Sequence, residues 1–136
     1  MSRPMTLGVR AVVEDASGRI LLVRHTYMPG LYFPGGGVEH SEPAYQALLR
    51  ELVEEAGITL DDAADLIGIF SNHANMRNDH VLLYRAGAWT QGKSTSRGEI
   101  AEIVWADPLE PPDDATPATR RRLMELYSSE PQSNFW

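Results

Sequence analysis

The chain contains no cysteine, and this absence excludes several kinds of site. Without thiols it cannot form disulfide bonds, zinc–thiolate centres or a cysteine nucleophile. It also lacks an apolar run long enough to span a membrane, and residues 1–10 contain none long enough for a signal peptide. We therefore expect a soluble cytoplasmic protein with no membrane partner.

Positive charge is scarce as well. Twelve Lys and Arg residues face 19 Asp and Glu residues, which gives a formal net charge of −7. A surface that binds duplex nucleic acid needs clustered Lys and Arg, so this balance argues against such a partner. A small polyphosphate substrate is still compatible with an acidic chain, because bound metal ions can supply positive charge locally.

With 136 residues, 43% of them hydrophobic, the chain is long enough for one good core and too short for two. We expect a single domain over 1–136, with its core at about 5–127 and a tail at 128–136. Alternating or continuous apolar residues predict strands at 6–14, 20–23, 66–71, 80–84 and 99–105. A turn at 15–18 suggests that the first two of these strands form a hairpin.

The segment Gly36–Ile58 combines a glycine-rich turn with a helix rich in glutamate. On a helical wheel of about 100° per residue, Glu54 and Glu55 lie at about 300° and about 40° from Glu51, so the three carboxylates share one face. The other side is an apolar stripe that would pack on a core: Tyr45, Leu48, Leu49, Leu52, Val53 and Ala56.

The predicted ends of this helix agree with its faces. Ser41 is a suitable N-cap, with Glu42 and Pro43 in the first turn, where a negative charge and a missing N–H are both tolerated. Gly57 is suited to the left-handed backbone that ends a helix.

Like charges gathered on one helix face repel one another. Arg50 can pair with Glu54 four residues later, which leaves Glu51 and Glu55 without a local partner. A hard divalent cation prefers carboxylate oxygen and would relieve the repulsion. The helix therefore predicts a metal site.

At these positions the sequence resembles the Nudix hydrolases. Their signature is Gly, five residues, Glu, seven residues, and then Arg-Glu-aliphatic-any-Glu-Glu-any-Gly-aliphatic. Every fixed position of that signature is occupied, by Gly36, Glu42, Arg50, Glu51, Leu52, Glu54, Glu55, Gly57 and Ile58. The resemblance implies an α/β fold, the Nudix α/β/α sandwich, in which a mixed sheet packs between helices.

The resemblance also implies the roles of the residues in this segment. Glu51, Glu54 and Glu55 would hold Mg²⁺ or Mn²⁺ and act in catalysis, and backbone of the glycine loop at Gly35 and Gly36 would join the metal site. Arg50 and Glu42 would steady the helix and its carboxylates.

The family usually supplies one more glutamate from outside the helix, several residues before an aromatic residue. Glu99 lies six residues before Trp105 and follows a polar, glycine-containing loop, so we favour it as the remote ligand or base. Glu102 is the competing candidate. The general base is open among Glu54, Glu99 and a loop histidine.

Residues around these segments are candidates for substrate binding. Tyr32 and Phe33 could stack on a base, although strand alternation must place one of them in the core. Arg10 and Arg24 could reach phosphate groups, although arginines at strand edges are more often plain surface. The segment from 72 to 80 carries His73 and His80, whose intrinsic pKa suits proton transfer and whose place on a loop suits recognition.

Late in the chain, Thr116 and Pro117 predict the N-cap and first residue of a second helix that runs to about Tyr127. We interpret the three arginines at 120–122 as solvated helix surface. The tail should be loose unless Phe135 and Trp136 dock, and a homodimer is one arrangement that would cover them.

The function that follows is metal-dependent hydrolysis of the diphosphate linkage in a small nucleotide-type substrate. Nucleoside triphosphates, ADP-ribose and nucleotide sugars are all candidates that the sequence does not rank. A catalytically silent Nudix-like domain that binds a nucleotide is the alternative. Hydrolysis of RNA ends is disfavoured by the acidic balance.

Overall fold

The structure is a computed structural model that describes residues 4–96 and 98–136. Four strands form a mixed sheet in the order β4 (Gly35–Gly37), β1 (Thr6–Val12), β7 (Asp79–Arg85) and β6 (Asp65–Ser71). β1 pairs with β7 in parallel, whereas the β4–β1 and β7–β6 pairs are antiparallel.

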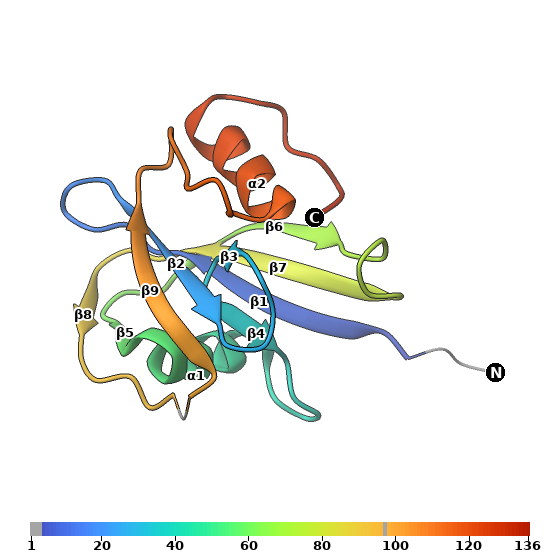
Figure 1. Ribbon diagram of the computed structural model, residues 1–136. Helices are drawn as coiled ribbons and strands as arrows, with labels where there is room; N and C mark the ends of the chain where they lie inside the picture. Colours follow the sequence, from blue (N-terminus) through green and yellow to red (C-terminus); the bar gives the residue numbers. More distant parts are fainter. Residues whose placement is uncertain (1–3, 97) are drawn as a thin grey trace.

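A second, antiparallel sheet has the order β3 (Leu31–Tyr32), β2 (Ile20–His25) and β9 (Ile100–Ala106). Two short strands that the sequence analysis missed, β5 (Ile58–Leu60) and β8 (Trp89–Gln91), pair with each other. Helices α1 (Ala44–Ala56) and α2 (Pro117–Tyr127) lie on opposite sides of the strands (Figure 1). The predicted α/β/α sandwich with a mixed sheet is confirmed.

The predicted hairpin of the first two strands is wrong. β1 lies between β4 and β7, and β2 lies between β3 and β9 in the other sheet. The two strands touch only where the turn joins them, through an isolated bridge from Glu14 to Ile20 and a bond from Leu21 N–H to Val13 O. The turn sets where the chain reverses, but buried long-range partners decide which edges pair.

The two helices pack on two separate parts of the core. Leu48 and Leu52 of α1 are fully buried against Val9 and Ala11 of β1, as the apolar stripe predicted. On the other side, α2 packs through Leu123 on a cluster of buried side chains that includes Phe33, Phe70 and Leu83. The core therefore fixes α1 against β1, the strand that also pairs with the glycine-rich β4.

The start of α1 differs from the prediction. The N-cap is Pro43, with no side-chain cap, and Ser41 lies outside the helix with φ +64°. Glu42 caps the preceding turn, where its carboxylate accepts a bond from Glu39 N–H. The end of the helix is as predicted, because Gly57 takes the left-handed conformation at φ +68°. A side chain there would also collide with the carbonyl oxygen of Gly92.

Helix α2 begins as predicted, with Thr116 Oγ1 accepting from Thr119 N–H at 3.2 Å and Pro117 in the first turn. The interpretation of Arg122 as solvated surface is wrong, because its side chain is fully buried. Its guanidinium carbon lies 4.2 Å from the ring centroid of Phe70, and it donates to Glu125 Oε2 at 2.8 Å. Burial of the cation is offset by this ion pair and the aromatic contact.

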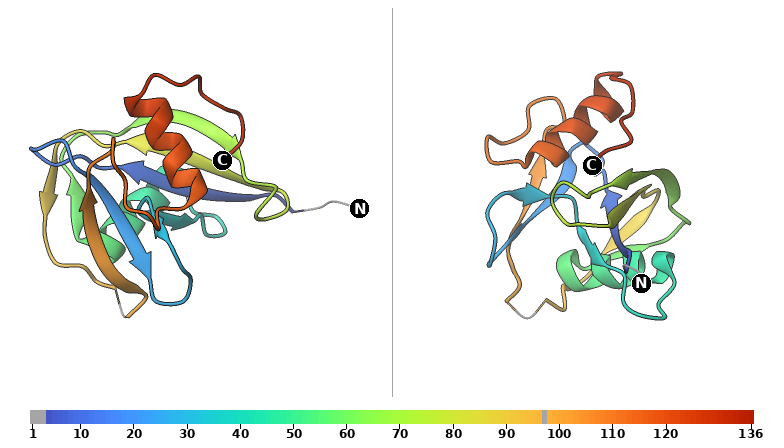
Figure 2. Two further views of the ribbon diagram at one scale, coloured as in Figure 1. Left: turned by 45° about the horizontal axis from the view of Figure 1, so that its top comes forward. Right: turned by 90° about the vertical axis from the view of Figure 1, so that its right-hand side faces the viewer.

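The tail is held by its own chain through Trp136, which meets the stated condition for an ordered end. Ser71 donates to Asn134 O and accepts from Trp136 N–H, both at 2.8 Å, so the tail runs beside β6 (Figure 2). The Trp136 ring packs on Phe33 and Phe70, and Phe135 is 69% exposed. Homodimer formation stays a prediction.

No helix in the described part of the chain is long and apolar enough to cross a membrane.

Candidate active site

The glycine turn brings backbone against the acidic helix. A side chain at Gly35 would overlap the Val9 carbonyl group of the neighbouring strand, so only glycine fits there. A Cβ atom at Gly36 would lie 2.7 Å from the carboxyl carbon of Glu51. Because Gly36 has no side chain, the Glu51 carboxylate can occupy the space above it.

Glu55 is the buried member of the glutamate set, with only 7% of its surface exposed. Its Oε1 accepts a bond from Gly35 N–H at 2.7 Å, which ties α1 to the glycine turn. Burial raises the pKa of Glu55 from 4.5 to about 7, although the Gly35 bond and the charge of Arg10 act in the opposite direction. Since a metal ligand must be deprotonated, a cation bound at Glu55 would replace this proton.

Arg50 holds the outer part of the set together. It binds Glu42 at 2.8 Å and Glu51 at 2.9 Å, and Glu54 more weakly at 3.4 Å. The expected pair of Arg50 with Glu54 is present, whereas the expectation that Glu51 has no local partner is wrong. The Arg50 contact lowers the pKa of Glu42 to about 2, whereas burial raises the pKa of Glu51. This geometry fits the supporting role expected for Arg50 and Glu42.

Arg10 on β1, which the sequence analysis named with Arg24 as a candidate for phosphate contact, is a neighbour of this site. Its Nη1 donates to Phe33 O at 2.8 Å, and its charge favours the ionised forms of Glu51 and Glu55. Strand alternation places it here, because Arg10 faces away from its buried neighbours Val9 and Ala11.

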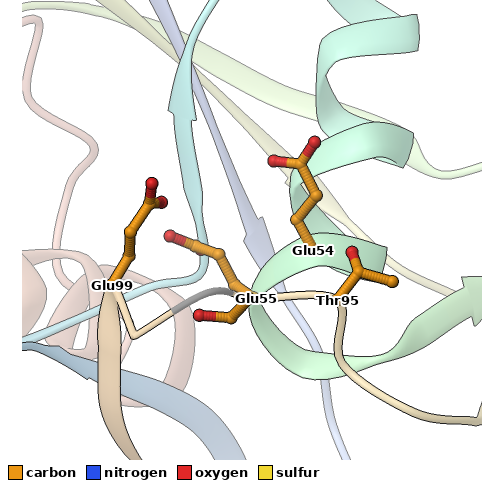
Figure 3. A pocket seen from close by; sticks show the side chains of 5 residues that line it. Glu54, Glu55, Thr95 and Glu99 are labelled. Carbon is orange, nitrogen blue, oxygen red and sulfur yellow. The ribbon is translucent and has the colours of Figure 1, made fainter.

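A pocket of about 340 Å³ opens beside the end of α1. It is lined by Glu54, Glu55, Thr95, Ser96 and Glu99, so carboxylates from the helix meet one from the start of β9 (Figure 3). Glu102 instead binds Arg24 at 2.6 Å and borders an adjoining hollow. The arrangement supports Glu99 over Glu102 as the remote carboxylate.

The donor set suits a hard divalent cation, because it consists of carboxylate oxygens above a backbone turn without side chains. Within residues 4–96 and 98–136, no three acidic or histidine side chains already form a complete ligand group. The Glu54 side chain is 45% exposed and Glu99 is exposed, so both can rotate into the pocket. Glu51 would exchange its Arg50 contact for the cation.

The structure separates the predicted substrate residues. Phe33 is 1% exposed and belongs to the core, so it offers no stacking surface, whereas Tyr32 is half-buried beside Arg10. Arg24 is engaged by Glu102 and Asp114.

The two histidines lie elsewhere in the fold. His73 accepts a bond from Asn78 N–H within its own loop, and His80 sits on β7 opposite Ser71 of β6. In the described part of the chain, neither is among the residues that line the glutamate pocket. The carboxylates Glu54 and Glu99 are the better-placed candidates for a general base.

The family model of the NUDIX domain matches residues 4–127. The chain belongs to the Nudix family. The resemblance drawn from Gly36 to Ile58 is thereby confirmed, and with it the class of Nudix hydrolases that act on phosphoanhydrides.

Individual Nudix relatives agree with this assignment. The chain is 30% identical over 122 residues to a putative 8-oxo-dGTP diphosphatase of Bacillus subtilis, a match that covers 89% of this chain and 79% of that protein. It is 44% identical over 55 residues to an RNA pyrophosphohydrolase of Teredinibacter turnerae, covering 40% of this chain and 32% of that protein. A MutT NUDIX hydrolase from Burkholderia pseudomallei superposes with a TM-score of 0.76 at 28% identity, covering 91% of this chain and 99% of that one.

Proposed function

We propose that this Nudix protein is a divalent-metal-dependent hydrolase that cleaves the diphosphate linkage of a free nucleotide. The observation that carries the proposal is the pocket lined by Glu54 and Glu55 of α1 and by Glu99, the residue just before β9. Glu51 lies on the same helix, over the side-chain-free backbone of Gly36. Three carboxylates that line one pocket, with Glu51 on the same helix, suit the cations that accompany a polyphosphate.

Bound Mg²⁺ or Mn²⁺ supplies charge neutralisation on phosphate oxygens and a sharper nucleophile than bulk water. Glu51 and Glu55 are the firmest ligands by position, since both are largely buried and backed by the glycine turn. Glu54 and Glu99 are more exposed. Either can hold a water molecule and accept its proton as that water attacks phosphorus.

The likeness to the Bacillus protein favours a nucleoside triphosphate, because that match spans most of both chains. Hydrolysis of RNA ends is the second candidate, because several relatives carry that name, but each of those matches covers less than half of the relative. The net charge of −7 favours the smaller substrate.

A release assay tests the proposal. The protein is incubated with Mg²⁺ and nucleoside triphosphates, an oxidised deoxyguanosine triphosphate, ADP-ribose, a nucleotide sugar or 5′-triphosphorylated RNA, and the cleaved products are identified. We expect release from at least one free nucleotide and no release in excess chelator.

Three outcomes would contradict the proposal. Full turnover in excess chelator would exclude the metal-dependent mechanism. Tight nucleotide binding without cleavage of any substrate would identify the chain as a silent binding domain, and faster cleavage of RNA ends than of free nucleotides would favour the second candidate.

A further inference from the structure

The turn between β2 and β3 presents a single exposed aromatic ring, that of Tyr27. This side chain is 71% exposed. The side chain does not hang freely, because its ring centroid lies 5.3 Å from that of His25. His25 in turn lies 5.5 Å from the Tyr32 ring. One ring thus faces solvent and two others support it.

His25 supports the Tyr27 ring by packing against it and not by hydrogen bonding. It is 6% exposed, and both of its ring nitrogens are buried with no hydrogen-bond partner among the described residues. Burial, together with the nearby charge of Arg10, lowers the pKa of His25, so the imidazole beneath Tyr27 is neutral. A neutral ring keeps the tilted contact between His25 and Tyr27 uncharged.

The same turn is fastened to the rim of the glutamate pocket. Thr26 N–H donates to Glu99 O at 3.0 Å, and the Thr26 hydroxyl donates to Gly98 O at 2.9 Å. Figure 1 shows the end of β2 beside the start of β9, where these contacts lie. Tyr27 therefore directly follows Thr26, which is hydrogen-bonded to the backbone at the rim of the pocket.

The far side of the turn is fixed as well. Tyr32 Oη donates to Pro29 O at 2.9 Å, and Gly30 closes the turn at φ +98°, where a side chain would approach Thr116. The residues from 26 to 30 carry no charged side chain. The turn thus offers a rigid, uncharged, aromatic surface next to a site whose carboxylates suit metal-bound phosphates.

We propose that Tyr27 is the stacking platform for the nucleobase of the substrate, with the phosphates directed into the glutamate pocket. This inference rests on the proposed function, since it names the part of the site that holds the other end of the nucleotide. Every base presents a flat face, so the platform accepts purines and pyrimidines alike and contributes affinity rather than choice of base.

The test compares Tyr27→Ala and Tyr27→Phe with the wild type, using ATP and dGTP with Mg²⁺. Loss of a stacked base by alanine substitution corresponds to a rise in KM of about 5- to 100-fold. Tyr27→Phe keeps the ring and should stay within about threefold of the wild type. Inorganic tripolyphosphate has no base, so its inhibition constant as a competitor should be the same in all three proteins.

Two results would overturn the platform. One is an unchanged KM for both nucleotides in Tyr27→Ala. The other is an equal weakening of nucleotides and tripolyphosphate, which would mean that the substitution disturbs the phosphate site.

Failure of the proposed function gives a different pattern. If the wild type cleaves neither nucleotide, calorimetric binding of ATP with Mg²⁺ replaces KM. Weaker binding by Tyr27→Ala would then still support the platform, and no ATP binding by the wild type would reject it.

Discussion

In metal-free solution we predict that the protein becomes less stable as pH rises from about 4.5 to about 7, because of Glu55. Burial raises the pKa of this carboxyl from 4.5 to about 7. In that range the folded protein keeps a proton that the unfolded chain has lost. The free energy of unfolding therefore falls with rising pH, and the contribution is complete below pH 4.5.

The magnitude follows from the size of the shift. A change from 4.5 to about 7 corresponds to about 3 kcal/mol at about 1.4 kcal/mol per pH unit. Other groups titrate nearby. His25, whose pKa is lowered, acts with the opposite sign, since its contribution is lost as pH falls below its ordinary pKa. A difference between two variants removes such background.

The assay is urea unfolding of the wild type and of Glu55→Gln in chelator at pH 5 and pH 8. Glutamine has the shape of a protonated glutamate and does not ionise. The variant should therefore match the wild type near pH 5 and exceed it by about 3 kcal/mol at pH 8. Mg²⁺ should then stabilise the wild type at pH 8 and have little effect on the variant. A stability difference that is the same at both pH values would refute this account of Glu55.

Three further predictions concern residues around the site and the core. Gly36→Ala places a Cβ atom 2.7 Å from the carboxyl carbon of Glu51 and should lower turnover at least about tenfold. Gly37→Ala is the matched control, because a Cβ atom there has nothing within 4 Å, and it should leave turnover unchanged in the same assay. Thr26→Val removes the hydroxyl that holds the Glu99 segment and should lower kcat about tenfold, with Thr26→Ser restoring it; the same loss in a Glu99→Gln background would contradict the link. Arg122→Gln should cost about 3 kcal/mol in urea unfolding, and a change below about 1 kcal/mol would mean that the buried ion pair contributes little.

Local signals in the sequence predicted the elements that carry the chemistry. The glutamate spacing fixed one face of α1, and Gly57 marked its end because a left-handed residue there needs no side chain. Thr116 and Pro117 marked the start of α2 in the same way. These features depend on residues within one or two helical turns, so a single sequence contains them.

Features that depend on distant partners were not predictable in this way. The pairing partner of β2 is β9, which lies some 80 residues later in the chain. Arg122 is buried because Phe70 and Trp136 enclose it, and nothing in a run of three arginines distinguishes the one that turns inward.

The candidate site shows the same division. The carboxylates of α1 follow from their spacing, whereas the place of Glu99 beside Glu55 depends on how β9 returns to the end of the helix. Arg10 joins them only because β1 pairs with the glycine turn.

The central claim is that the carboxylates of α1 hold the catalytic metal. It is tested most directly by turnover with Mg²⁺ in Glu54→Gln and Glu55→Gln, with Glu110→Gln as a control at an exposed glutamate. We predict that each of the first two variants remains folded and loses roughly 10²-fold or more in kcat, and that the control stays at the wild-type rate. Near-normal rates in both helix variants would contradict the assignment of this helix as the metal site.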